Sequence, residues 1–190
     1  MATNAIANHY INCSSNVLSS GWATGNNFIF CYRFTIFAGY SSYNKSSCCN
    51  LIQICSRTVE ATISRLPKKG FDISQVISGY GTCPIAPPIF DELRAMDRVN
   101  TALIYGATVK YLVNCEDAEI EAVLDQLPFS ASRRFGERFY DLFEEGKHDF
   151  YIVDKDIHTI AYYEITNLAT GRTFRAGKIR EDMLKDSLFN

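Results

Sequence analysis

Acidic residues are absent from the first 59 positions of this 190-residue chain, and this asymmetry divides the sequence into two unlike parts. All 21 aspartates and glutamates lie from Glu60 onward. The lysines and arginines before that point are Arg33, Lys45 and Arg57. Because a folded surface normally carries charges of both signs, we expect residues 1–45 to behave differently from residues 46–190.

The first part is low in charge and rich in Ser, Asn, Gly and aromatic residues. Residues 28–37 alternate as a strand would, but both faces of that strand would be apolar, so it would have to be buried on both sides. Two interpretations remain open. Residues 1–45 form an atypical extension with one strand and a flexible leader, or they are a stretch that was never selected for folding, such as translation in a wrong frame.

The composition disfavours several classes of protein. A net charge of -2 is unfavourable for a general nucleic-acid binder, which normally has a concentrated basic surface. The longest apolar run, residues 28–37, is interrupted by Arg33 and is far shorter than the roughly 20 residues that span a bilayer. We therefore expect no nucleic-acid partner and no membrane segment.

The cysteines predict reduced thiols. There are seven, Cys48 and Cys49 are adjacent, and no CxxC pair or histidine cluster provides the paired ligands of a zinc site. We expect a cytoplasmic protein without a metal.

Residues 46–190 show the alternation of elements typical of a mixed α/β (α+β) fold. We predict a single layered domain with the following elements: helices at 52–66, 91–105, 117–127, 139–146 and 181–188; strands at 108–113, 150–153 and 159–168; a hairpin strand at 172–176; and a turn-rich loop at 78–88.

Arg57 and Glu60 lie three residues apart in the first predicted helix, so their side chains project from neighbouring positions. From the spacing alone, the simplest interpretation is a solvated ion pair on the helix surface. Several ordered motifs bear on this interpretation: Ile52-Gln53-Ile54, Arg57-Thr58-Val59-Glu60, Tyr80-Gly81-Thr82-Cys83-Pro84-Ile85-Ala86-Pro87, Pro128-Phe129-Ser130-Ala131-Ser132 and Asn167-Leu168-Ala169-Thr170-Gly171-Arg172-Thr173-Phe174-Arg175-Ala176-Gly177-Lys178-Ile179.

These motifs resemble the C-terminal half of the methenyltetrahydromethanopterin cyclohydrolase family. The resemblance implies hydrolysis of the 5,10-methenyl bridge of tetrahydromethanopterin to the N5-formyl form, in one-carbon metabolism and methanogenesis. It implies a pterin substrate, no separate cofactor, and a homo-oligomer. A non-catalytic remnant or interaction protein that retains the fold is the alternative.

The resemblance also implies roles for individual residues. It places the catalytic pair on Arg57 and Glu60, with Glu60 removing a proton from the attacking water and Arg57 keeping that carboxylate ionised. The expected substrate-binding residues are Gln53, Tyr80, Thr82, Arg98 and Asn100. An ordinary turn at Tyr80 and Thr82, and a solvated helix at Arg98 and Asn100, would account for the same residues without a ligand. The family's Gly-Arg-Thr-Asn-Asp stands here as Asp97-Arg98-Val99-Asn100-Thr101, which changes the local charge.

Overall fold

A six-stranded mixed sheet in the order β2-β1-β3-β4-β5-β6 organises the fold. The computed structural model describes residues 10–18, 29–36, 54–55, 57–87, 89–149 and 151–189. The strands are β1 (Tyr10–Leu18), β2 (Ile29–Ile36), β3 (Val76–Pro84), β4 (Thr108–Val113), β5 (Tyr162–Asn167) and β6 (Thr173–Gly177). Strands β4 and β5 are parallel, and the other neighbours are antiparallel.

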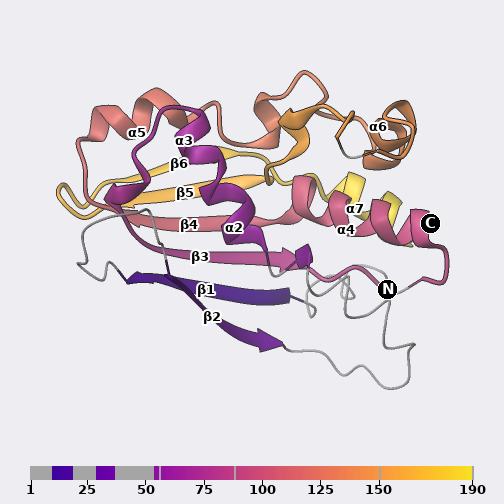
Figure 1. The fold of residues 1–190 in the computed structure, drawn as a ribbon, viewed down its shortest axis with the longest axis horizontal. Coiled ribbons are helices and arrows are strands. Elements are labelled where there is room, and N and C mark those ends of the chain that lie inside the picture. Colours follow the sequence, from indigo (N-terminus) through magenta and orange to yellow (C-terminus); the bar gives the residue numbers. More distant parts are fainter. Residues whose placement is uncertain are drawn as a thin grey trace.

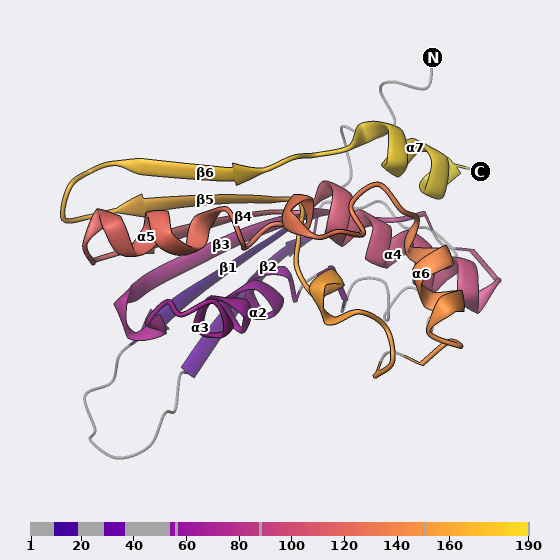
Figure 2. The same ribbon diagram turned by 90° about the horizontal axis from the view of Figure 1, so that it is seen from above.

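Helices cover one side of this sheet and one end of it. The α-helices are α2 (Thr58–Ile63), α3 (Arg65–Lys68), α4 (Glu92–Gly106), α5 (Asp117–Leu124), α6 (Phe139–Glu145) and α7 (Glu181–Phe189). Short 3-10 turns are η2 (Ile73–Gln75), η3 (Phe129–Ala131) and η4 (Lys155–Ile157). Figures 1 and 2 show α2, α3 and α5 on the same side of the strands, whereas α4, α6 and α7 gather beyond one end of the sheet. None of the helices in the described part of the chain is long and apolar enough to cross a membrane.

The apolar core has two parts that follow this division. The larger part lies between the sheet and α2, α3 and α5, and it includes Val59, Leu66, Val109, Tyr163 and Ile165. The smaller part joins α4, α6 and α7, and it includes Tyr105, Phe129, Phe139, Leu142 and Leu184. Burial of these side chains is the main favourable contribution to folding.

In β3 to β6, the other face of the sheet is polar. Successive side chains of a strand point to opposite faces, and in β4 the buried Val109 and Tyr111 alternate with the exposed Lys110. Glu164 of β5 joins Lys110 (Nζ to Oε1, 3.1 Å) to Arg175 of β6 (Nε to Oε2, 3.0 Å) across three neighbouring strands. This row of ion pairs suits a face that contacts water.

Most predicted elements of residues 46–190 are confirmed. The helix predicted at 91–105 is α4, and the side chain of Asp91 accepts a hydrogen bond from Arg94 N (3.1 Å) as its N-cap. The predicted strand at 108–113, the helix at 117–127, the hairpin and the terminal helix correspond to β4, α5, β5–β6 and α7. The mixed α/β class is therefore correct.

The turn-rich loop predicted at 78–88 is wrong, because β3 extends through Pro84 in the interior of the sheet. The prediction of a turn rested on Gly79 and Gly81, which have another function in the structure. A Cβ at Gly79 would lie 2.8 Å from Cε1 of Tyr111, and one at Gly81 would lie 3.0 Å from Cγ2 of Val59. The glycines thus allow close packing within a strand, which is a known use of glycine there.

The strand predicted at 150–153 is also wrong in its described part. Residues 151–153 form a turn in which the Asp149 carboxylate accepts a hydrogen bond from Tyr151 N (2.8 Å). The carbonyl of Asp149 accepts from Ile152 N (3.1 Å) and Val153 N (3.2 Å). Local bonding by an aspartate side chain outweighs the strand propensity of these residues.

In the N-terminal part of the chain, strand β2 agrees with the strand interpretation of residues 28–37. Strand β1 pairs with β2 on one side and with β3 on the other. The division of the chain into residues 1–45 and 46–190 stays a prediction.

Candidate functional site

Arg57 and Glu60 lie at the start of α2, on the side of the helix that faces away from the sheet. Helix α2 begins after Arg57, whose carbonyl accepts the first helical hydrogen bond from Ala61 N (2.8 Å). Val59 and Ile63 are buried against the sheet. Because the apolar positions face inward, the helical period turns Arg57 and Glu60 outward.

The two side chains form a bidentate ion pair. Arg57 Nε donates to Glu60 Oε2 (2.8 Å), and Arg57 Nη2 donates to Glu60 Oε1 (2.6 Å). The side chains are 57% and 41% exposed, so the pair is open to solvent in the described part of the chain. Two parallel bonds fix the carboxylate plane relative to the guanidinium plane.

This pairing controls the ionisation of Glu60. The hydrogen bonds from Arg57 lower the pKa of the Glu60 carboxyl below its ordinary value, partial burial opposes this shift, and the Arg57 charge adds to it. Glu60 is therefore a carboxylate at neutral pH. Each of its oxygens retains a second lone pair that can accept a hydrogen bond from water.

Tyr80 and Thr82 lie on the opposite face of the sheet from this pair. Gly79 and Gly81 face Val59 and Thr58 of α2, so the alternating side chains of Tyr80 and Thr82 point the other way. Thr82 Oγ1 lies 2.6 Å from Thr108 Oγ1 on β4, on that polar face. The structure does not bring these two residues together with Glu60.

Arg98 and Asn100 are on α4, at the end of the sheet (Figure 1). Arg98 Nε donates to the carbonyl of Ser187 (3.1 Å), and its Nη1 donates to the carbonyl of Pro87 (3.3 Å). Asn100 Nδ2 donates to Met96 O in the preceding turn (2.8 Å). Arg98 therefore joins α4 to α7 and to the segment after β3. Gln53, the remaining expected substrate-binding residue, lies outside the described residues.

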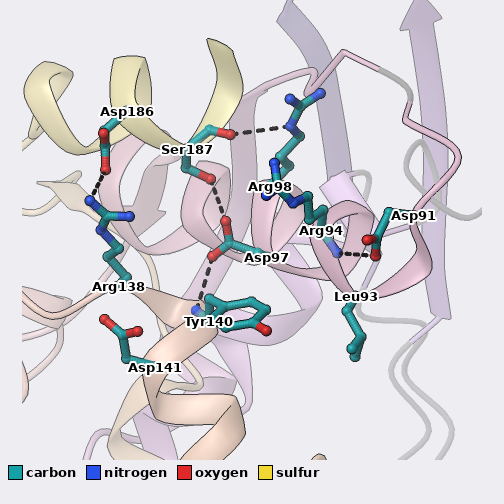
Figure 3. A pocket seen from close by; sticks show the side chains of 10 residues that line it. All are labelled: Asp91, Leu93, Arg94, Asp97, Arg98, Arg138, Tyr140, Asp141, Asp186 and Ser187. Carbon is teal, nitrogen blue, oxygen red and sulfur yellow. Dashed lines mark hydrogen bonds and ion pairs between the residues drawn. The ribbon is translucent and has the colours of Figure 1, made fainter. Parts of the chain in front are cut away.

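Arg98 also lines a cavity that the sequence interpretation did not include. Its wall contains Arg94, one helical turn before Arg98, and Arg138 and Tyr140 at the start of α6 (Figure 3). The i,i+4 spacing of Arg94 and Arg98 in the helix predicted at 91–105 was the available signal.

Within the described residues, no group of three or more His, Cys, Asp or Glu side chains is arranged to hold a metal ion. Cys55, Cys83 and Cys115 are free thiols. Burial raises the pKa of the Cys83 thiol well above its ordinary value, and the hydrogen bond with Cys55 adds to this effect, so Cys83 is not a thiolate nucleophile.

Comparison with known proteins agrees with the order of motifs. A family model described as "Cyclohydrolase (MCH)" matches residues 40–188. The methenyltetrahydromethanopterin cyclohydrolase of Methanothermobacter marburgensis is 39% identical over 144 residues, an alignment that covers 75% of this chain and 45% of that relative.

Bacterial relatives give the same result. The methenyltetrahydromethanopterin cyclohydrolase of Methylobacterium sp. (strain 4-46) is 34% identical over 135 residues, covering 71% of this chain and 42% of the relative. The methenyltetrahydromethanopterin cyclohydrolase of Rhodopirellula baltica is 35% identical over 137 residues, covering 71% of this chain and 41% of the relative. The chain thus spans less than half the length of these curated relatives. Because the family model covers most of the chain, the protein belongs to the cyclohydrolase (MCH) family.

Proposed function

We propose that this chain carries the reacting pair of a cyclohydrolase that converts 5,10-methenyltetrahydromethanopterin to the N5-formyl form. The observation that carries the proposal is the bidentate contact between Arg57 and Glu60 at the start of α2. The activity of the relatives supplies the substrate class of the proposal.

The substrate needs little activation beyond a positioned base. Its methenyl carbon lies between two nitrogens in a cationic amidinium, so it is already electrophilic. Glu60 accepts the proton of a water as the water oxygen bonds to that carbon. The carbon then breaks its bond to N10, which takes up a proton, and the formyl group remains on N5. One water is consumed and one proton is released overall.

Arg57 has two functions in this scheme. Its hydrogen bonds keep Glu60 ionised, since they lower the pKa of the carboxyl. In the proposed scheme its guanidinium also stabilises the oxygen that becomes the formyl oxygen. The negative charge of Glu60 favours the cationic ring system of the substrate.

The remaining expectations belong to the same proposal. Gln53, Tyr80, Thr82, Arg98 and Asn100 stay predicted substrate contacts. The protein is proposed to be a cytoplasmic homo-oligomer, and the free thiols among the described residues support a reducing compartment.

One observation favours the second candidate, a non-catalytic protein that retains the fold. Both oxygens of Glu60 accept bonds from Arg57, and the pair is open to bulk water, which weakens every electrostatic interaction at the reacting carbon. In that case the chain would be a remnant or an interaction protein that does not hydrolyse the pterin.

The two candidates differ in one assay. Purified chain is mixed with 5,10-methenyltetrahydromethanopterin, and loss of the methenyl absorbance is followed beside Arg57→Ala and Arg133→Ala variants. Arg133 is exposed, so its variant controls for net charge. The enzyme is supported if the chain hydrolyses the substrate faster than buffer does, if Arg57→Ala lowers this rate, and if Arg133→Ala leaves it unchanged. Hydrolysis no faster than the buffer rate contradicts the enzyme and supports the non-catalytic protein.

A further inference from the structure

Four basic residues come together where α3 contacts the short turn η4. Arg65 and Lys68 lie three residues apart on α3, so their side chains project from neighbouring positions. Lys155 and His158 are also three residues apart, and His158 N donates to the carbonyl of Lys155 (3.1 Å), a spacing at which side chains of a 3-10 turn eclipse. An ion pair between Arg65 and Asp156 (Nη2 to Oδ1, 3.6 Å) joins the two elements. We call Arg65, Lys68, Lys155 and His158 the basic cluster.

Arg65 forms the buried base of the basic cluster. It is 6% exposed, and a charged side chain is seldom buried to this extent unless its charge is compensated. Its Nη2 donates to the carbonyl of Gln126 (3.2 Å), whereas its contact with Asp156 is longer than a hydrogen bond. Its buried Nε has no hydrogen-bond partner among the described residues. Arg65 therefore retains unused N–H donors and a charge that Asp156 compensates only in part.

The other three members of the cluster lie at the surface, where a ligand can reach them. Lys68, Lys155 and His158 are exposed. None of their side chains forms a hydrogen bond or an ion pair with another described residue. Their donors are therefore available to a ligand, and the fold within the described residues does not depend on contacts of these side chains.

The electrostatic potential at the cluster is positive. Partial burial lowers the pKa of His158, and the charges of Lys68, Arg65 and Lys155 lower it further. All the charges that act on the imidazole are thus positive, so Asp156 does not reverse the potential there. A bound anion would offset these charges and favour protonation of His158.

The number of donors in the cluster favours a compact anion with several oxygens. A phosphate monoester carries a charge of about −1.5 to −2 at pH 7 and several strong acceptor oxygens. A guanidinium, two ammonium groups and an imidazole N–H can each donate to such a group. A carboxylate has one charge and fewer acceptor oxygens, so it would leave part of the positive charge without compensation.

We propose that the basic cluster between α3 and η4 binds a phosphate group, either as free phosphate or as a phosphate monoester. Arg65 contacts the group from the protein side, and Lys68, Lys155 and His158 contact it from the surface. The proposal does not depend on the hydrolysis proposed for the Arg57–Glu60 pair, because none of its evidence comes from that pair.

The test is an NMR titration of the isotopically labelled full chain, with the imidazole of His158 as the reporter. Inorganic phosphate and methyl phosphate are added separately, and chloride at equal ionic strength controls for screening. We expect saturable shifts of the His158 ring signals and of the η4 amides for at least one probe. Because binding and protonation are linked, the pKa of His158 should also be higher in that probe than in chloride. The probe that binds more tightly distinguishes free phosphate from a monoester.

Matched variants then assign the site. Lys68→Gln and Lys155→Gln should each weaken binding by at least about fivefold, the loss expected for one charge-assisted contact at a surface. Both side chains are exposed, so the variants should keep the native spectrum. Lys110→Gln removes an equal charge from the polar face of the sheet and should leave the apparent Kd unchanged. Absence of saturation with both probes, an equal pKa of His158 in phosphate and in chloride, or equal weakening by Lys110→Gln would overturn the proposal.

Discussion

A Cβ atom added to Gly81 of β3 would lie 3.0 Å from Cγ2 of Val59 in α2. Helix α2 therefore packs directly on the strand backbone, and this contact sets the position of the helix that carries Arg57 and Glu60. The close approach is possible because glycine has no side chain on that face of the strand.

Replacing Gly81 by alanine should destabilise the protein by about 1–3 kcal/mol, the usual cost of an added methyl group in a packed core. The free energy of unfolding in urea measures this cost. In a Val59→Ala background the methyl group gains space, so the same replacement should cost less, with a coupling of at least about 0.5 kcal/mol. An equal cost in both backgrounds would show that the two residues do not restrict each other.

Tyr111 supports α2 from β4 through its buried hydroxyl group. The hydroxyl lies 2.6 Å from Thr62 Oγ1 and donates to the carbonyl of Val59 (3.1 Å). Tyr111→Phe should cost about 1–2 kcal/mol, because it removes a buried hydrogen-bonding group while keeping the ring. Tyr80→Phe, on the polar face of the same sheet, is the matched control and should change the unfolding free energy by less than half as much.

The pKa of Glu60 should depend on Arg57. Arg57→Gln removes the bidentate contact, so the carboxyl pKa should rise from its lowered value toward the ordinary one. The lowered pKa means that the pair favours the folded state above the ordinary carboxyl pKa and loses this contribution as the pH falls through the lowered value. A carbon-detected NMR titration of the Glu60 carboxyl measures the shift.

A second ion pair provides the control for this titration. Arg175 is the largest cause of the lowered pKa of Glu164. Arg175→Gln should therefore raise the pKa of Glu164 and leave that of Glu60 unchanged. A Glu60 titration that is insensitive to Arg57→Gln would contradict the electrostatic role assigned to that residue.

Local signals in the sequence predicted the elements whose causes are local. The residues of the 91–105 segment predicted a helix there, which is α4, and the three-residue spacing in a helix predicted the contact between Arg57 and Glu60. Both depend on residues within one or two turns. Such interactions can be inferred without knowledge of the fold.

The features that the sequence did not predict depend on contacts between distant residues. Gly79 and Gly81 indicated a turn, but their function is to admit α2, about 20 residues earlier in the chain. The placement of Tyr80 on the opposite face from Glu60 follows from the register of β3 and the side that α2 occupies. Neither the packing of α2 on these glycines nor the face on which Tyr80 lies can be predicted from the spacing of residues along the chain.

The replacement Glu60→Gln tests most directly the proposal that Glu60 is the base in hydrolysis of the methenyl bridge. Its amide keeps the shape of the side chain but cannot accept the proton of the attacking water. Hydrolysis of 5,10-methenyltetrahydromethanopterin should fall by at least about 10²-fold, the usual contribution of a general base, while the apparent Kd changes little. Glu181→Gln, on the exposed face of α7, should retain the wild-type rate. Hydrolysis by Glu60→Gln at the wild-type rate would contradict the assignment.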